Sequence, residues 1–173
     1  MKKLLTTHYS LLTRQKGFTL IEILVVVGII GLLASVVLSG LGSVRGRGRD
    51  ARRAADLRSV QQGLELYYTK CQRYPGGSTC TDVTAPTSWS DLEIRLKGSS
   101  LGVSGIPNDP LTTDAARNYK YAVSSDGQEY ILEAVLEDAS SPILRDSYKE
   151  PTPPGFSGAA VNCTAASHYC IKF

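Results

Sequence analysis

Glu22 is the one charged side chain in a run of sequence that extends from Phe18 to Val44. The run is long enough to cross a bilayer as a helix, because about 20 apolar residues already span the hydrocarbon core. A charged group inside such a segment costs roughly 2.5 to 3.5 kcal/mol at the bilayer centre and less near an end. Since an acid there is expensive, we expect it to pair with a cation, and Glu22 is a candidate functional residue.

Four cysteines form two local couples beyond the apolar run, Cys71 with Cys80 and Cys163 with Cys170. An even count in a domain that looks exported favours disulfides over free thiols. Four cysteines allow three pairings, and we favour the two local ones. A metal site is the alternative, but neither couple has the CxxC spacing of zinc ligands, and the chain has only two histidines.

The motifs of common enzyme classes are missing from the sequence. GxSxG, HExxH, the P-loop and the glycine-rich dinucleotide fingerprint do not occur. His8 lies in the basic N-terminal segment, and His168 stands between cysteines that we expect to be bonded. We therefore predict that the protein is not an enzyme.

Charge is segregated along the chain, although the net charge is only +3. Residues 1–17 are basic and free of acid, like the first part of an export signal, whereas residues 74–173 are acidic. Between them, a cluster of arginines follows the apolar run: Arg45, Arg47, Arg49, Arg52, Arg53 and Arg58. Such a cluster can hold anionic lipid headgroups or nucleic-acid phosphates. We favour a third interpretation, in which this basic segment meets the acidic region of another copy.

The apolar run is predicted to continue as an amphipathic helix. One face of that helix is made by residues spaced three or four apart: Ala54, Leu57, Val60, Leu64, Tyr67 and Cys71. Gly46 and Gly48 each weaken the junction by about 1 kcal/mol relative to Ala, so we expect a bend or local melting there. Pro75, followed by Gly76 and Gly77, predicts the end of the helix.

The second half of the chain is predicted to form loops and a small antiparallel sheet. Residues 79–108 are loop-like, with a short amphipathic segment at 89–96. Further on, Asp126-Gly127 separates two alternating segments, which is a strong hairpin signal. The side chains expected on the inner face are Tyr119, Tyr121, Val123, Tyr130, Leu132, Ala134 and Leu136. The last residues are expected to add a further strand, which gives an α+β fold with a long hydrophobic-then-amphipathic helix packed on a small antiparallel sheet.

The stretch KGFTLIE, residues 16–22, resembles the processing site of type IV prepilins and of the related pseudopilins. The resemblance implies a pilin fold, cleavage by a prepilin peptidase between Gly17 and Phe18, and N-methylation of Phe18. Cleavage creates an amine at Phe18, and Glu22 lies four residues further on, so the two groups share a helix face. In this family the amine that meets the glutamate is understood to come from a neighbouring subunit, which makes Glu22 an assembly residue.

The resemblance also implies how the chain is organised. Residues 1–17 form a cleaved leader, 18–44 a membrane-spanning and filament-core helix, 45–75 an amphipathic helical stem, and 76–173 a globular exported head. The precursor is expected in the cytoplasmic membrane as a single-pass protein, and the mature subunit in an extracellular filament at the cell surface. The implied partners are other copies of itself, the prepilin peptidase, an assembly platform with its ATPase, and membrane lipid before assembly.

We favour a structural subunit of a type IV pilus over a major pseudopilin of type II secretion. Pseudopilins typically continue through Asp-Pro-Trp-Gly into a calcium-binding loop, but here Leu111 follows Asp109-Pro110. Asp109, Asp114 and Asp126 still offer oxygen ligands of the kind that Ca²⁺ prefers, so calcium is the one cofactor left open. A membrane-anchored binding module that uses the arginine-rich stem is an alternative of a different class, with nucleic acid a less favoured ligand.

Overall fold

The structure is a computed structural model that describes residues 17–76, 80–82, 84–99, 102–111 and 113–173, except for the side chains of residues 39–41. The predicted leader therefore lies outside the described residues, apart from Gly17. The chain divides into two compact units, Met1–Leu41 and Gly42–Phe173.

Helix α1 (Leu20–Cys71) begins in the first unit and continues into the second. Nearly all the described residues of the first unit belong to this helix. The segment Leu20–Leu38 has a mean hydropathy of 2.8, and none of its residues is buried within the protein. Among the described residues it is the one helical segment long and apolar enough to cross a membrane. The apolar run thus forms a helix that lacks any protein partner in the single chain.

In the second unit, α1 presents the predicted apolar face to the head. Five members of that face are buried: Ala54, Leu57, Val60, Leu64 and Tyr67. The sixth, Cys71, is partly buried. We expected a bend or local melting at Gly46 and Gly48; the helix continues through both, so local melting does not occur there. A Cβ placed on Gly46 would lie 3.6 Å from the Glu137 carboxylate, and arginines of the next turn bind that same group. These contacts with the head offset the weak helix propensity of glycine.

Helix α1 ends earlier than predicted, at Cys71 rather than near Pro75. Gln72 takes the left-handed conformation, with φ of 56°, and its N–H donates to the carbonyl of Tyr68 at 2.7 Å. This is the hydrogen bond of a left-handed helix cap, a position usually filled by glycine. The Pro-Gly sequence therefore follows the cap instead of ending the helix.

Four strands form one antiparallel sheet in the order β3-β1-β2-β4. They are β1 (Lys120–Ser124), β2 (Tyr130–Val135), β3 (Phe156–Gly158) and β4 (His168–Lys172). The predicted hairpin is confirmed, with Val123 opposite Tyr130 and Gly127 in the turn at φ of 72°. The C-terminal strand is also confirmed, whereas β3 was not predicted.

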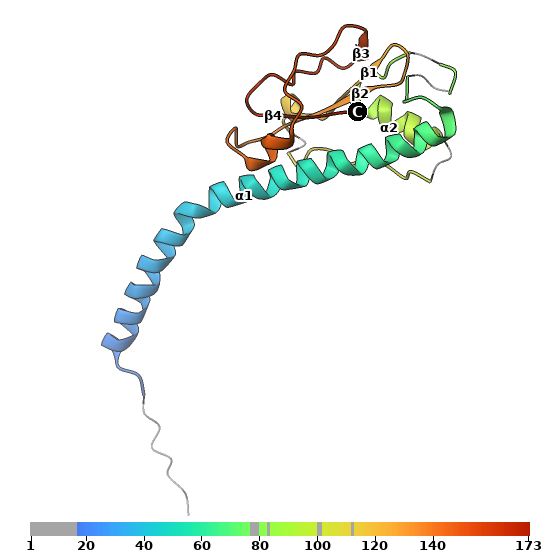
Figure 1. Cartoon of the computed structure of the whole chain (residues 1–173). Helices are drawn as coiled ribbons and strands as arrows, with labels where there is room; N and C mark the ends of the chain where they lie inside the picture. The colour runs from blue at the N-terminus through green and yellow to red at the C-terminus, as the bar shows by residue number, and fades with distance from the viewer. Residues whose placement is uncertain (1–16, 77–79, 83, 100–101, 112) are drawn as a thin grey trace, which may run out of the picture. The chain divides into compact units, whose positions relative to one another are not determined.

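The core lies between the sheet and the stem part of α1, which run alongside each other in Figure 1. All seven side chains predicted for the inner face of the sheet are buried there. Helix α2 (Trp89–Gly98) confirms the short amphipathic segment and adds Trp89, Leu92 and Leu96 to the core. The 3-10 turns η1 (Ala115–Arg117) and η2 (Pro142–Asp146) complete the unit. The α+β fold is thus as predicted.

Candidate functional site

Glu22 caps the first turn of α1. Its backbone N–H donates to Thr19 Oγ1 at 3.3 Å, and its carboxylate accepts from the Thr19 N–H at 3.4 Å. This reciprocal pair is a capping box, in which two of the four free N–H groups at a helix start gain partners. Glu22 therefore has a local role in the single chain, and its carboxylate also faces the positive end of the helix dipole.

The helix that follows Glu22 is exposed on every side. Large apolar side chains such as Ile21, Leu32 and Val36 are 68–70% exposed. A Cβ added at Gly28 or Gly31 would meet no atom within 4 Å, so these glycines leave the helix surface open. An apolar surface of this extent marks a site that is covered by lipid or by other protein.

The arginines that follow the apolar run differ in exposure: Arg53 is buried, Arg49 is half-buried, and the other four are exposed. Arg53 is fully buried, and its guanidinium forms a two-pronged contact with Asp109, Nε to Oδ2 at 2.6 Å and Nη2 to Oδ1 at 3.0 Å. Its Nη1 donates to Asp50 and to Glu137, each at 2.8 Å. Arg49 contacts both carboxylate oxygens of Glu137, at 2.7 and 2.6 Å. We call these five residues the ionic cluster.

The ionic cluster joins the start of the stem to two loops of the head. Asp50 accepts the backbone N–H groups of Glu137 and Asp138 at 2.9 and 3.0 Å, which holds the chain just after β2. Asp109 also accepts the N–H of Leu111 at 2.8 Å. Each buried charge thus has a partner of opposite sign or a backbone donor, as the low dielectric of the interior demands.

Electrostatics within the ionic cluster favour the charged forms. Burial alone would lower the pKa of Arg53, but its hydrogen bonds to Asp109, Glu137 and Asp50 outweigh that effect and raise it. The hydrogen bonds from Arg49 lower the pKa of Glu137 from 4.5 to about 2, despite an opposing effect of burial. The Arg53 guanidinium and the Glu137 carboxylate therefore stay charged throughout the physiological pH range.

Of the six arginines that follow the apolar run, four lie outside the ionic cluster: Arg45, Arg47, Arg52 and Arg58. Arg47 Nε lies 3.7 Å from Asp138 and Arg52 Nε 3.8 Å from Asp56, with the two arginine side chains 74% and 64% exposed. Arg45 and Arg58 are exposed and make no hydrogen bond or ion pair with any residue that the structure describes. Arg45 and Arg58 are thus free to meet other molecules, whereas Arg47 and Arg52 are held only by loose, exposed ion pairs.

Contacts between the basic stem and the acidic head occur within one copy. Arg49 and Arg53 bind Asp109 and Glu137, which belong to the head of the same chain. Further acids of the head pair locally, for example Glu129 with Lys172 at 3.0 Å. Charge complementarity, which the sequence led us to expect between copies, is therefore partly satisfied inside each one.

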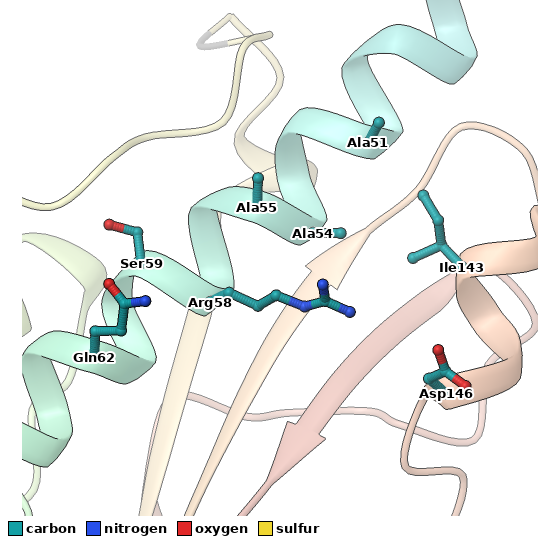
Figure 2. Close-up of a pocket in the computed structure, with 8 residues that line it drawn as sticks. All are labelled: Ala51, Ala54, Ala55, Arg58, Ser59, Gln62, Ile143 and Asp146. Atoms are coloured by element: carbon teal, nitrogen blue, oxygen red, sulfur yellow. The ribbon is translucent and has the colours of Figure 1, made fainter.

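An open hollow of about 470 Å³ lies between α1 and η2 (Figure 2). Small side chains form its α1 wall, and Ile143 and Asp146 its η2 wall. Arg58 extends across it in Figure 2. The residues that line the hollow are Ala51, Ala54, Ala55, Arg58, Ser59, Gln62, Ile143 and Asp146.

The cysteines are bonded in the two local pairs that we favoured. Cys71 at the end of α1 bonds Cys80, with the Cα atoms 5.0 Å apart, and Cys163 bonds Cys170 of β4 at 5.7 Å. Each bond closes a short loop, and a loop of about ten residues stabilises a fold by about 2.5 kcal/mol in the chain-entropy estimate. The second bond packs with Ile131 on the face of the sheet opposite α1.

His168 and its neighbours make a polar contact on the same side of the sheet as the second disulfide. Glu133 is buried, and its carboxylate lies 2.8 Å from His168 Nδ1 and 2.9 Å from Lys120 Nζ. The same carboxylate accepts the N–H of Asn162, which fixes the chain ahead of the disulfide loop. This contact anchors the C-terminal loop to β2.

The three aspartates considered as calcium ligands serve separate local contacts. Asp109 binds Arg53, Asp114 accepts the N–H of Ala116 at 3.1 Å, and Asp126 accepts from Ser124 in the hairpin turn. Among the described residues, no three histidine, cysteine, aspartate or glutamate side chains gather in a way that suits a metal ion.

Two features of the site were missed in the sequence although signals for them exist. Thr19-x-x-Glu22 has the spacing of a capping box just before an apolar run. Arg53 precedes Leu57 by four residues and Val60 by seven, so it continues the buried face of α1. Two acidic partners of Arg53, Asp109 and Glu137, carry no comparable signal, because they are distant from it in the sequence.

A comparison with protein families matches residues 12–38 to the prokaryotic N-terminal methylation motif. These residues include Gly17, Phe18 and Glu22. The match covers the start of α1 and the segment before it, and it leaves the head unassigned.

Comparisons with curated proteins extend the likeness beyond the N-terminal segment. The chain is 34% identical to the type II secretion system core protein G of Pectobacterium carotovorum, over 58% of this chain and 65% of that protein, just under two thirds of its length. It is 32% identical to the core protein G of Klebsiella pneumoniae, over 66% of this chain and 78% of the relative. A fimbrial protein of Neisseria meningitidis is 26% identical over 87% of each chain. No solved structure matches.

Proposed function

Because this chain belongs to the family of type IV pilins and type II secretion pseudopilins, we propose that it is a structural subunit of a helical filament. The observation that carries the proposal is the exposed apolar helix Leu20–Leu38, none of whose residues is buried within the protein. Before assembly this surface faces lipid, and in the filament it faces the same helix of other copies.

The change from lipid to protein contact requires close packing, because lipid tails are as apolar as the helix itself. Gly28 and Gly31 leave space at the helix surface, where the backbone of a neighbour can approach. Polar pairing supplies the remaining specificity. Glu22 is the one acid available for it within the apolar run.

Processing of the precursor follows from the same proposal. A prepilin peptidase cuts between Gly17 and Phe18, and Phe18 is methylated on its new amine. In the filament the Glu22 carboxylate of one copy meets the Phe18 amine of the next, which removes the cost of a lone buried charge. Extraction from the membrane draws its energy from an assembly platform with an ATPase, and the cytoplasmic leader places the head outside the cytoplasmic membrane.

The kind of filament is a separate question, and a pseudopilus of type II secretion is a second candidate. The comparisons do not support our preference for a pilus, since the relatives of at least 30% identity reported above are secretion core proteins. The fimbrial relative matches over more of the chain, at lower identity. We therefore propose a subunit of this filament class and keep both forms as candidates.

The first test is intact mass and N-terminal sequencing of the protein from its native cells. We expect a mature chain that begins at methylated Phe18. A chain that begins at Met1, or one cut elsewhere, would contradict the proposal. Loss of surface filaments in a deletion strain favours a pilus, and accumulation of normally exported proteins inside the cell favours a pseudopilus.

Three variants separate the ion-pairing role of Glu22 from its capping role. Glu22→Gln keeps a capping box but removes the charge, Glu22→Ala removes both, and Thr19→Ala removes mainly the cap. We expect all three to be processed, and both Glu22 variants to lose filaments while Thr19→Ala retains them. Filaments from Glu22→Gln at the normal level would show that capping, and not charge, is what assembly needs.

A further inference from the structure

Arg45 and Arg47 are the first charged residues after the apolar run, and both remain exposed, although Arg47 lies in a loose ion pair with Asp138 of the head. Arg45 is exposed and pairs with no residue that the structure describes. Arg47 is 74% exposed, and its Nε lies 3.7 Å from Asp138, beyond hydrogen-bond distance. Two guanidinium groups are therefore held at the surface next to the predicted membrane segment.

Acids in the same part of α1 are already engaged and turned inward. Asp50 is buried and accepts from Arg53 and from two backbone N–H groups. Asp56 accepts the hydroxyl of Tyr119 at 2.8 Å. Positive charge is disfavoured on the exported side of a membrane segment, so its concentration here calls for a ligand of opposite charge.

Distance along the helix separates Arg45 and Arg47 from the later arginines. The segment with membrane-spanning hydropathy ends at Leu38, six residues before the end of the apolar run. At 1.5 Å per residue along the helix, Arg45 and Arg47 follow Leu38 by about 10 and 13 Å, whereas Arg52 and Arg58 follow it by about 21 and 30 Å. Side chains on a helix lean toward its N-terminus, here toward the membrane segment. The headgroup layer is about 5 to 8 Å thick on each side of the hydrocarbon, so only the first pair has side chains long enough to reach it.

We infer that Arg45 and Arg47 bind the phosphates of anionic phospholipids in the leaflet on the side of the head. A guanidinium presents a planar fork of donors that fits two phosphate oxygens at once. The inference rests on the proposed insertion of α1 in a membrane. It adds a site that holds the unassembled subunit at a fixed depth and that is vacated when the subunit leaves the bilayer.

The test measures which lipid the full-length chain prefers. The protein is reconstituted in phosphatidylcholine bilayers, and spin-labelled phosphatidylglycerol and phosphatidylcholine report their relative association with it. An arginine near a charged surface changes binding by about fivefold, so we expect the wild type to prefer phosphatidylglycerol by at least about fivefold. Arg45→Gln/Arg47→Gln should lose most of that preference.

A matched control removes the same number of exposed charges from the same helix. Arg52→Gln/Arg58→Gln should keep the preference, because those side chains lie beyond the headgroups. An equal loss in both double variants would overturn the inference, since it would mean that net charge alone attracts the lipid. Protease protection first establishes insertion: a chain that fails to insert refutes the proposed function, and one that inserts without lipid preference refutes only the headgroup site.

Two additions distinguish other sources of phosphate. Inorganic phosphate, exchanged for chloride at constant ionic strength, should leave the lipid preference in place if the site belongs to headgroups. If inorganic phosphate abolishes the lipid preference, the site binds free anions and the inference is overturned. The second addition is a short DNA duplex in the absence of phosphatidylglycerol. If the duplex binds the wild type but not Arg45→Gln/Arg47→Gln, the pair of arginines binds nucleic acid and the inference is overturned.

Discussion

Replacing Arg53 with methionine tests whether the ionic cluster holds the head on the stem. The guanidinium makes four hydrogen bonds, to Asp50, Asp109 and Glu137, at 2.6 to 3.0 Å. Methionine fills similar space but leaves Asp50 and Asp109, each about 1% exposed at the side chain, without their cation. Breaking a buried ion pair from one side costs about 3 to 5 kcal/mol, so we expect a loss of that size in the free energy of unfolding of the head.

The neighbouring residue provides the control for this measurement. Arg52 is 64% exposed, with its nearest acid at 3.8 Å, and Arg52→Met should change stability by no more than about 0.5 kcal/mol. Unfolding of the head is followed in detergent by near-UV circular dichroism, which reports the packed tyrosines. If Arg53→Met falls within 1 kcal/mol of Arg52→Met, the cluster does not stabilise the fold and our reasoning is wrong.

Three further predictions concern the second unit. The pKa of Glu137 is lowered from 4.5 to about 2, so its contribution is complete above pH 4.5 and disappears as the pH falls toward 2. Solvent screening reduces this contribution to about 1 to 2 kcal/mol, and acid titration of an Arg49→Gln variant should show a smaller stability loss over that range. Gln72→Gly should stabilise the head by up to about 1 kcal/mol in thermal unfolding, because glycine accepts the φ of 56° without strain, and Gln72→Ala should not. Cys163→Ser/Cys170→Ser should lower the free energy of unfolding by about 2.5 kcal/mol relative to the wild type under oxidising conditions. The two proteins should be equally stable when the wild type is reduced.

Local patterns explain why much of the fold was predictable from the sequence. The buried face of α1 repeats every three or four residues, and Asp126-Gly127 stands between two alternating segments, so each element carries its own signal. Strand β3 carries none. It has only three residues, and its pairing with β1 brings Gly158 opposite Ala122, far away in the sequence. That glycine has a φ of 120°, and a Cβ there would lie 2.8 Å from the carbonyl oxygen of Tyr121.

The role of Glu22 was predictable from the sequence, whereas the burial of individual arginines in the stem was not. Glu22 stands out because one acid in an apolar run is costly. By contrast, a run of arginines gives no sign of which members are buried, since burial depends on carboxylates that the fold brings from elsewhere. Arg53 and Arg52 are adjacent and chemically identical, yet one is fully buried and the other is 64% exposed.

The head is tied to the stem by the ionic cluster around Arg53 at one end and by the disulfide at Cys71 at the other, with the apolar core between them. In a subunit drawn out of a bilayer by its helix, mechanical load would enter the head at the first of these points. Asp109 and Glu137, which both belong to the head, hold Arg53, so the load is shared between contacts that must break together rather than one after another. The head is thereby arranged to resist shear along the helix, while the covalent bond at the far end keeps the loop after the helix from peeling away.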